Sequence, residues 1–299
     1  MKMENTLFPE LANSYIDKAV KRVELAYYQH QQITTDKMYL AFSGGKDSIC
    51  LFYVALTAFN NLGVKMEDVC DVEYNLTSVD PPELVYFIRE FKEKYPFVKI
   101  SYPKLNMFQL IEKKHILPTA TRRFCCSELK ESKGNQGFTL TGVRWAESVK
   151  RRSRQAFEDG KNKIIKTNDN DDLRKSVEFC IRNRRYYCNP IIDWSDEDVW
   201  NYIRKNNLPY CKLYDEGFKR IGCIGCPLSN KKNREREFDK YPKYKNLYLR
   251  SIERICEWHK AKGRTSLITV DEMYNWWMNR NYNIENNDYT NSLFTETEE

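Results

Sequence analysis

The stretch Met38-Tyr39-Leu40-Ala41-Phe42-Ser43-Gly44-Gly45-Lys46-Asp47-Ser48 places a short apolar run directly before a pair of glycines. Residues 38–42 predict a buried strand, and the apolar residues of 48–59 predict a buried helix. Glycines at such a junction allow a tight turn in which several backbone N–H groups face one anion, at the positive end of the helix. The stretch therefore predicts a phosphate-binding loop that consists of Ser43, Gly44, Gly45, Lys46, Asp47 and Ser48.

The side chains of this loop suit the same ligand. Lys46 can neutralise phosphate charge, Ser43 and Ser48 can donate hydroxyl hydrogen bonds, and Asp47 can orient a metal ion or a water. The spacing is not that of the Walker loop, in which Lys-Ser/Thr ends a longer glycine loop. The alternative is a serine–glycine turn that binds nothing, and the complete string at a strand-to-helix junction argues against it.

Strand-like and helical segments alternate along the first two thirds of the chain. Beyond the first strand, the strands are expected at 69–74, 98–102 and 138–143, and the helices between them at 80–91 and 107–113. The polar residues 158–178 predict a loop, and Ser195-Asp196-Glu197-Asp198 predicts the start of a helix, with Ser195 as its N-cap. Such alternation predicts an α/β fold with a Rossmann-like, doubly wound parallel sheet. The pattern fades after Cys211, where helices are expected at 241–262 and 270–279. The predicted organisation is an N-terminal helical segment (1–33), a nucleotide-binding α/β domain (34–210) and a helical, cysteine-containing C-terminal region (211–299).

Composition fits a globular protein with an anionic partner. The 299 residues are 41% hydrophobic and 30% charged, with a formal net charge of +7. No apolar run approaches the roughly 18 residues of a membrane span, and the N-terminus lacks the layout of a signal peptide. We therefore expect a cytoplasmic protein without a membrane partner. The positive charge fits a nucleotide or a nucleic acid, although a solvated mixed-charge surface is the alternative for each basic run, such as Lys231 to Arg236.

Four of the ten cysteines form two clusters, Cys125-Cys126 and Cys223-x-x-Cys226. In a chain without a secretion signal, clustered cysteines more often bind metal or do chemistry than form disulfides. Four thiolates suit an iron–sulfur cluster or a zinc ion, and the adjacent pair departs from the usual spacing of zinc ligands, which favours iron–sulfur. Four buried thiols without a metal are the third interpretation.

The loop resembles the SGGxDS signature of the pyrophosphatase-loop (PP-loop) ATPases. Further segments resemble the phosphoadenosine phosphosulfate (PAPS) reductase family, and with the loop they extend over about residues 38–228 in that family's order. These segments are Thr121 to Lys130 with the double cysteine, Gly142-x-Arg144-x-x-Glu147-Ser148-x-x-Arg151, Pro190 to Trp194, Asp198 to Trp200, Leu208 to Tyr210, Leu213 to Phe218 and Ile221 to Cys226.

The resemblance implies an adenine nucleotide alpha hydrolase-like fold whose loop holds the pyrophosphate end of ATP while the α-phosphate is attacked, with Mg²⁺ offsetting the phosphate charge. It implies nucleotide contacts by Arg144, Glu147 and Arg151, of which Arg144 also follows an apolar run at the expected carboxyl edge of the sheet. Surface charge is the alternative for these arginines. In iron–sulfur members of the family, a [4Fe–4S] cluster is held by cysteines that match Cys125, Cys126, Cys223 and Cys226.

Two departures from the sulfonucleotide reductases affect the expected activity. Those enzymes attack sulfur with a cysteine in a C-terminal tail, whereas residues 286–299 contain none, and their phosphate loop is degenerate, whereas Lys46 and Asp47 are intact here. Both departures favour an ATP-pyrophosphatase that adenylates its substrate for sulfur transfer, similar to the one in DNA phosphorothioation. Its catalytic residues would be Lys46, Asp47 and Arg144.

The partners expected for this activity are an adenine nucleotide, DNA or another nucleic acid as the acceptor, a cysteine desulfurase or another sulfur donor, and a second copy of the chain. Two other functions stay open. One is a thiol-dependent PAPS or adenylyl-sulfate reductase, which would need Cys256 or an external thiol as its nucleophile. The other is a non-catalytic ATP-binding subunit of a larger complex.

Overall fold

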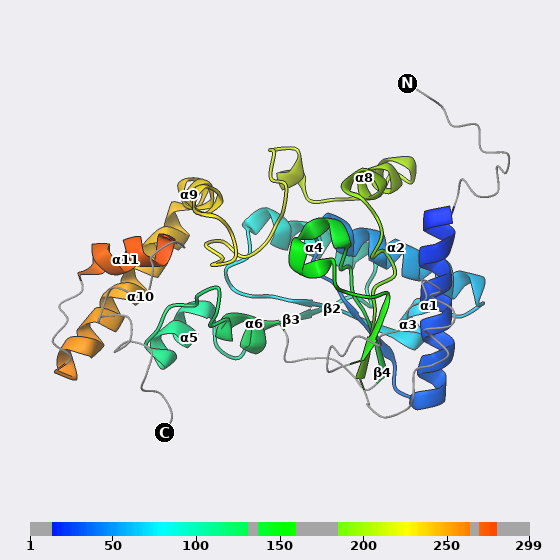
Figure 1. The fold of residues 1–299 in the computed structure, drawn as a ribbon, viewed down its shortest axis with the longest axis horizontal. Coiled ribbons are helices and arrows are strands. Elements are labelled where there is room, and N and C mark those ends of the chain that lie inside the picture. Colours follow the sequence, from blue (N-terminus) through cyan, green and yellow to red (C-terminus); the bar gives the residue numbers. More distant parts are fainter. Residues whose placement is uncertain (1–13, 131–136, 160–184, 264–268, 280–299) are drawn as a thin grey trace. The chain divides into compact units, whose positions relative to one another are not determined.

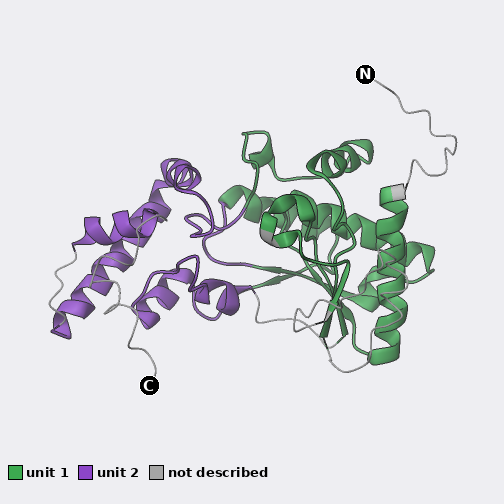
Figure 2. Ribbon diagram, in the orientation of Figure 1, with its two compact units in different colours: residues 1–75, 82–101, 133–221 green, residues 76–81, 102–132, 222–299 purple. Residues whose placement is uncertain are grey.

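The computed structural model describes residues 14–130, 137–159, 185–263 and 269–279 (Figure 1). The chain divides into two compact units that are not consecutive in sequence (Figure 2). The sequence suggested consecutive boundaries after residues 33 and 210, whereas the second unit also takes in two segments from within 34–210. The first unit contains residues 1–75, 82–101 and 133–221, and the second contains residues 76–81, 102–132 and 222–299.

The first unit is built on one mostly parallel sheet, in the order β3-β2-β1-β4-β6-β5. Neighbouring strands are parallel except for β5, which runs antiparallel to β6. The four predicted strands are present, and the α/β class is confirmed. β5 and β6 were not predicted, and most of the loop expected at 158–178 lies outside the described residues. The strands are β1 (Met38–Ala41), β2 (Cys70–Asn75), β3 (Lys99–Ser101), β4 (Gly137–Leu140), β5 (Phe157–Asp159) and β6 (Arg185–Cys188).

Helices flank this sheet, and α2 packs against both α1 and α8. The ring of Phe42, just after β1, lies 5.9 Å from that of Phe52 on α2 and 4.9 Å from that of Phe91 on α4. These buried contacts fix the glycine turn between β1 and α2, because both of its ends are anchored in the core. The helices are α1 (Ser14–Ile33), α2 (Lys46–Asn61), α3 (Met66–Val69), α4 (Pro82–Lys94) and α8 (Asp196–Lys205), with the 3₁₀ turns η2 (Trp145–Glu147), η3 (Val149–Arg151) and η4 (Lys212–Tyr214).

A buried ion pair ties α1 to the segment before α8. The guanidinium of Arg22 donates to the carbonyl oxygen of Pro190 at 2.8 Å and to Oδ1 of Asp193 at 2.7 Å. Burial alone would raise the pKa of Asp193, but hydrogen bonds from Arg22 and Lys18 outweigh it, so the pKa lies below its usual value. The pair therefore stabilises the fold above the ordinary pKa of an aspartate, and this contribution is lost as the pH falls through the lower pKa of the folded state.

We expect Arg22→Met to lower the free energy of unfolding by about 3 kcal/mol at neutral pH, since it leaves the Asp193 carboxylate without its buried partner. The loss should shrink at about pH 3, because this pH lies below the ordinary aspartate pKa of about 3.9, so that the unfolded chain binds a proton that the folded ion pair disfavours. Urea unfolding followed by circular dichroism at both pH values measures it. Lys18 also pairs with Asp193, at 3.1 Å, but is half exposed, so Lys18→Met should lower stability by about 1 kcal/mol or less. Equal losses in the two variants would contradict this assignment.

The second unit is helical around an aromatic core. The ring of Tyr248 lies 4.8 Å from that of Trp277 and 5.7 Å from that of Phe238. The helices expected at 107–113, 241–262 and 270–279 are present, whereas α6 and α9 were not predicted. Within the described residues, no helix combines the length and the apolar character that crossing a bilayer requires. The helices are α5 (Met107–Lys114), α6 (Phe124–Leu129), α9 (Lys231–Lys240), α10 (Pro242–Ala261) and α11 (Val270–Met278).

Candidate functional site

The phosphate loop lies where the strand order of the first unit reverses. From β1 the chain goes on to β2, while β4 lies against the other side of β1. In open α/β sheets, ligands bind beyond the carboxyl ends of the strands at such a point. The turn after β1 and the segment after β4 touch there: a Cβ atom on Gly142 would lie 3.2 Å from the carbonyl oxygen of Asp47. The structure thus brings the two sequence-predicted segments together.

The turn itself requires glycine. Gly44 has φ +70°, and a Cβ atom there would lie 2.6 Å from Cδ1 of Ile88 on α4. Two serine hydroxyls close the turn: Ser48 Oγ donates to the carbonyl oxygen of Gly45 at 2.9 Å, and Ser43 Oγ donates to Ser48 Oγ at 3.2 Å. The predicted strand, turn and helix are therefore present, with the N-terminus of α2 at the turn, where the helix dipole favours an anion.

Two buried cations and two carboxylates meet beside the turn. The Lys46 ammonium donates to Asp47 Oδ1 at 3.1 Å and to Asp196 Oδ1 at 3.0 Å. The Arg144 guanidinium donates to Asp47 Oδ1 at 2.7 Å, to Asp196 Oδ1 at 2.7 Å and to the carbonyl oxygen of Trp194 at 3.0 Å. The predicted catalytic residues Lys46, Asp47 and Arg144 thus lie together, and the side chains of the two cations are only 8% and 1% exposed.

Asp196 is a member of this group that the sequence did not reveal. The sequence Ser195-Asp196-Glu197-Asp198 predicts only a helix start, and Ser195 does cap α8. Burial alone would raise the pKa of Asp196, but hydrogen bonds from Lys46 and Arg144 outweigh it, so the pKa lies below its usual value and the side chain is ionised at neutral pH. The contact joins residues 150 positions apart, which local sequence patterns do not report.

Tyr214 is a second member that the sequence did not identify. Its hydroxyl accepts a hydrogen bond from the backbone N–H of Lys46 at 2.9 Å. Burial raises the pKa of Tyr214 above its ordinary value, so the hydroxyl stays protonated. A backbone N–H group at the start of α2 is the type of donor that would bind a phosphate oxygen. Tyr214 thus contacts the loop at a donor that a bound phosphate would also use.

The other two predicted nucleotide contacts lie next to Arg144. The backbone N–H of Arg144 donates to Glu147 Oε2 at 3.1 Å, and the guanidinium of Arg151 also donates to that carboxylate. Burial and the neighbouring guanidinium groups of Arg220 and Arg154 lower the pKa of Arg151. These positively charged guanidinium groups repel one another, and a bound anion would reduce this repulsion. The structure therefore groups Arg144, Glu147 and Arg151, and their contact with a nucleotide stays a prediction.

The four clustered cysteines lie within the second unit. Cys125 is hydrogen-bonded to Cys126 on α6, and both Cys223 and Cys226 are close enough to act on it electrostatically. The hydrogen bond with Cys126 and burial together raise the pKa of the Cys125 thiol. Burial likewise raises the pKa of Cys223, which the ammonium of Lys130 opposes. Segments separated by almost one hundred residues thus place these four cysteines in the same unit.

The Cys223-x-x-Cys226 loop is held by hydrogen bonds from several directions. The backbone N–H of Ile224 donates to the carbonyl oxygen of Val79 at 2.8 Å, and Tyr248 Oη donates to the carbonyl oxygen of Ile224 at 3.1 Å. The N–H of Gly225, which has φ +72°, donates to Glu237 Oε2 at 2.8 Å. Fixed backbone of this kind can present cysteine side chains to one ligand.

These cysteines fit a thiolate-bound cofactor by donor type. A cluster or a zinc ion would be bound by deprotonated sulfurs, whose negative charge the nearby Lys130 ammonium would offset. Within the described ranges, however, no three or more histidine, cysteine or acidic side chains are arranged to hold a metal ion as they stand. The cofactor is therefore a proposal that rests on the donor set.

Comparison with known proteins gives a family match over most of the chain. A sequence model described as the phosphoadenosine phosphosulfate reductase domain matches residues 37–229. An adenosine 5'-phosphosulfate reductase of Oceanobacillus iheyensis is 26% identical over 211 residues, which are 68% of this chain and 76% of that protein. An uncharacterised protein of Methanocaldococcus jannaschii is 28% identical over 250 residues, which are 80% of this chain but only 54% of that protein.

Two solved structures are similar at low sequence identity. A phosphoadenylyl-sulfate reductase from Candida auris, in a phosphate complex, is 17% identical with a TM-score of 0.44, over 74% of this chain and 98% of that chain. An FMN adenylyltransferase of Candida glabrata, in complex with FAD and inorganic pyrophosphate, is 13% identical with a TM-score of 0.49, over 75% of this chain and 69% of that chain.

Proposed function

This chain belongs to the phosphoadenosine phosphosulfate reductase domain family, and from this premise we propose that it is an ATP-pyrophosphatase that adenylates a substrate for sulfur transfer. The nucleotide would bind at the loop of residues 43–48, with its phosphates toward Lys46 and Arg144. The acceptor would be a nucleic acid, as in DNA phosphorothioation, or a small molecule.

The observation that carries the proposal is the pair of buried cations beside an intact loop. The Lys46 and Arg144 side chains are almost fully buried, and both reach the two carboxylates beside the turn. A group of this kind offers positive charge to linked phosphates in a place with little water, where electrostatic interactions are strong. Three phosphates use such a site more fully than the single α-phosphate of adenylyl sulfate.

In the proposed reaction, an oxygen of the acceptor attacks the α-phosphorus of ATP. A bond from that oxygen to phosphorus forms, the bond between the α-phosphorus and the bridging oxygen breaks, and its electron pair leaves with pyrophosphate. Lys46 and Arg144 would stabilise the charge that develops on the leaving phosphates, and the hydroxyls of Ser43 and Ser48 would orient them. Mg²⁺, when bound, would offset phosphate charge, and Asp47 and Asp196 are the carboxylates available to hold it.

We further propose that Cys125, Cys126, Cys223 and Cys226 hold a [4Fe–4S] cluster, with zinc as the alternative. The cluster, when bound, would supply sulfur chemistry or brace the second unit. A sulfur donor such as a cysteine desulfurase would then deliver the sulfur that displaces AMP from the activated acceptor. A second copy of this chain and a cytoplasmic location belong to the same proposal.

Lys46→Ala is expected to lower the rate of pyrophosphate release from ATP by about 100-fold or more, the usual effect of removing a group that stabilises charge in the transition state. A coupled assay specific for pyrophosphate, with the acceptor candidates present, measures this rate. Lys92→Ala removes an exposed lysine on α4 and should leave the rate unchanged. Undiminished turnover in Lys46→Ala would refute the role of the loop.

Relatives named as adenosine 5'-phosphosulfate reductases support the second function, a thiol-dependent reductase. It predicts sulfite release from adenylyl sulfate in the presence of a thiol. Cys256 on α10 is the internal candidate for its nucleophile, but burial raises the pKa of that thiol, which disfavours the reactive thiolate. The third function, a non-catalytic subunit, predicts ATP binding without pyrophosphate or sulfite release.

A further inference from the structure

Asp196 differs from the other charged groups of the phosphate site in its exposure. Its side chain is 68% exposed, whereas the two cations that it binds, Lys46 and Arg144, are 8% and 1% exposed. It is the first residue of α8 and its Oδ1 atom accepts hydrogen bonds from both cations, at 3.0 and 2.7 Å. An exposed carboxylate thus occupies two buried cations that would otherwise attract anions from solution.

The charges of this group balance without a ligand. Lys46 and Arg144 carry two positive charges, and Asp47 and Asp196 carry two negative charges. A chain of linked phosphates brings further negative charge and needs the same cations. It must displace Asp196, against like-charge repulsion, or share a cation with it. Carboxylate and phosphate oxygens are the ligands that Mg²⁺ prefers, usually with one or two carboxylates from the protein.

We propose that Asp196 is a positioning residue that makes phosphate binding at this loop dependent on a divalent cation. Without the cation, its carboxylate competes with the phosphates for Lys46 and Arg144. With the cation, the carboxylate and the phosphates become ligands of the same ion, so that the carboxylate favours phosphate binding instead of opposing it. The inference deepens the proposed function, on which it rests only in requiring a ligand with linked phosphates.

The test uses inorganic pyrophosphate as the probe, titrated calorimetrically into the full chain with excess Mg²⁺ or with EDTA. Wild-type protein should bind about tenfold more tightly with Mg²⁺, within the usual range of coupling between two ligands. Asp196→Asn retains an oxygen that can accept from Lys46 and Arg144 but removes the charge. It should bind more tightly than wild type in EDTA, and its gain from Mg²⁺ should fall to about twofold or less.

Glu197→Gln is the matched control. Glu197 lies in the same first turn of α8 and is exposed, and its side chain makes no ion pair or hydrogen bond with the residues that the structure describes. Glu197→Gln removes the same charge from the same helix end as Asp196→Asn does, so a long-range effect of charge on pyrophosphate binding would alter both variants alike. Asp196→Ala should lose the gain from Mg²⁺ as Asp196→Asn does, and circular dichroism establishes that each variant is folded.

Three results would overturn the proposal. The first is a wild-type affinity for pyrophosphate that does not change with Mg²⁺, and the second is an Asp196→Asn protein that keeps the full gain in affinity from Mg²⁺. The third is an Asp196→Asn protein that loses affinity equally with and without Mg²⁺, because this outcome indicates a residue that only braces the site. The proposed function fails separately, when pyrophosphate binding shows the predicted coupling but no pyrophosphate is released from ATP. A protein that turns over ATP without the coupling would refute the role of Asp196 alone.

Discussion

Replacing Arg144 with lysine is expected to lower the rate of pyrophosphate release from ATP by about 100-fold or more. The guanidinium makes hydrogen bonds of 2.7, 2.7 and 3.0 Å to Asp47, Asp196 and the carbonyl oxygen of Trp194. A lysine at this position has one nitrogen on a flexible stem and cannot keep this planar arrangement. The substitution therefore preserves the charge but not its direction, which separates positioning from net electrostatic attraction.

Arg152→Lys supplies the matched control for this prediction. Arg152 belongs to the same segment but is exposed, so its replacement should leave the rate within about twofold, as is usual for a surface site. The measurement is steady-state pyrophosphate release, with circular dichroism and thermal unfolding to establish that both variants are folded. A rate in Arg144→Lys close to that of wild type would mean that charge alone suffices, and Arg144 would lose its place among the catalytic residues.

The loop and the core of the sheet could be predicted from the sequence because their signals are local. An apolar run, two glycines and a second apolar run define β1, the turn and α2 within 24 consecutive residues, 38–61. Arg144 was found by the same logic, since it follows the apolar run that forms β4 and so had to lie near the carboxyl edge of a parallel sheet. Alternation of strands and helices supplied the rest of the architecture.

The members of the site that the sequence did not predict make contacts that no local pattern encodes. Asp196 and Tyr214 approach Lys46 from 150 and 168 residues further along the chain. Their own surroundings have other sufficient explanations: Asp196 lies in a capped helix start and Tyr214 in an aromatic segment, where its ring lies 5.2 Å from that of Trp200. A residue that satisfies one local role gives no sequence signal of a second, tertiary one.

Short and polar elements were missed for a related reason. α9 (Lys231–Lys240) is so rich in charge that it was interpreted as a basic run, and its buried side chains are Arg234 and Phe238. The Arg234 guanidinium lies 3.9 Å from the ring centroid of Trp277 and donates to the carbonyl oxygen of that residue at 2.7 Å. A buried arginine stacked on an aromatic ring here packs in the core where an apolar side chain is usual. A search for hydrophobic periodicity does not detect such a residue.

Cys223→Ser is expected to remove most of the iron and sulfide from protein purified without oxygen, where wild type should carry about four irons per chain and a broad visible absorbance band. Serine lacks the thiolate that binds iron, and the remaining three sulfurs leave one coordination position of the cluster without its ligand. Elemental analysis of iron, sulfide and zinc on the purified chains measures the effect directly and needs no enzymatic activity.

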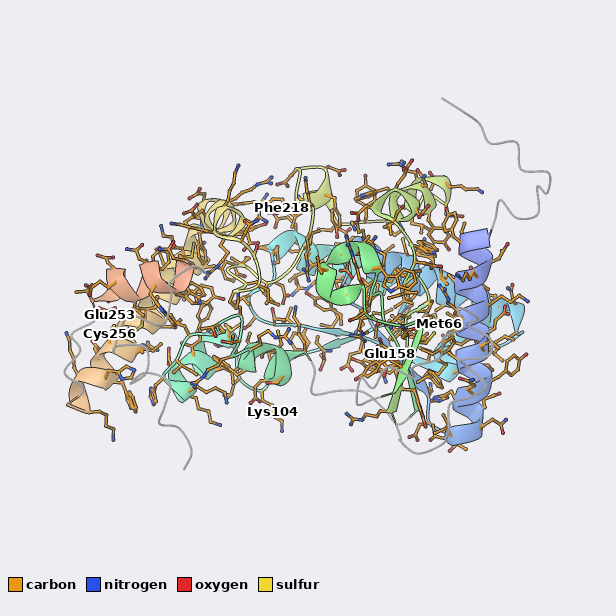
Figure 3. All side chains as sticks on the ribbon, viewed as in Figure 1. Met66, Lys104, Glu158, Phe218, Glu253 and Cys256 are labelled. Carbon is orange, nitrogen blue, oxygen red and sulfur yellow. The ribbon has the colours of Figure 1, made fainter. Side chains whose placement is uncertain are left out.

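The matched control is Cys256→Ser, which replaces another cysteine of the same unit, on α10 (Figure 3). Cys256 belongs to neither cysteine cluster, so its replacement should leave the iron content unchanged. If Cys223→Ser keeps its iron, or if both variants lose it equally, the quartet does not hold the cluster.

Zinc in place of iron would mean that the four sulfurs have a structural role and that the chemistry takes place at the phosphate loop. Sulfite release that depends on Cys256 would instead turn the assignment toward a reductase, because a nucleophilic thiol would then be present after all.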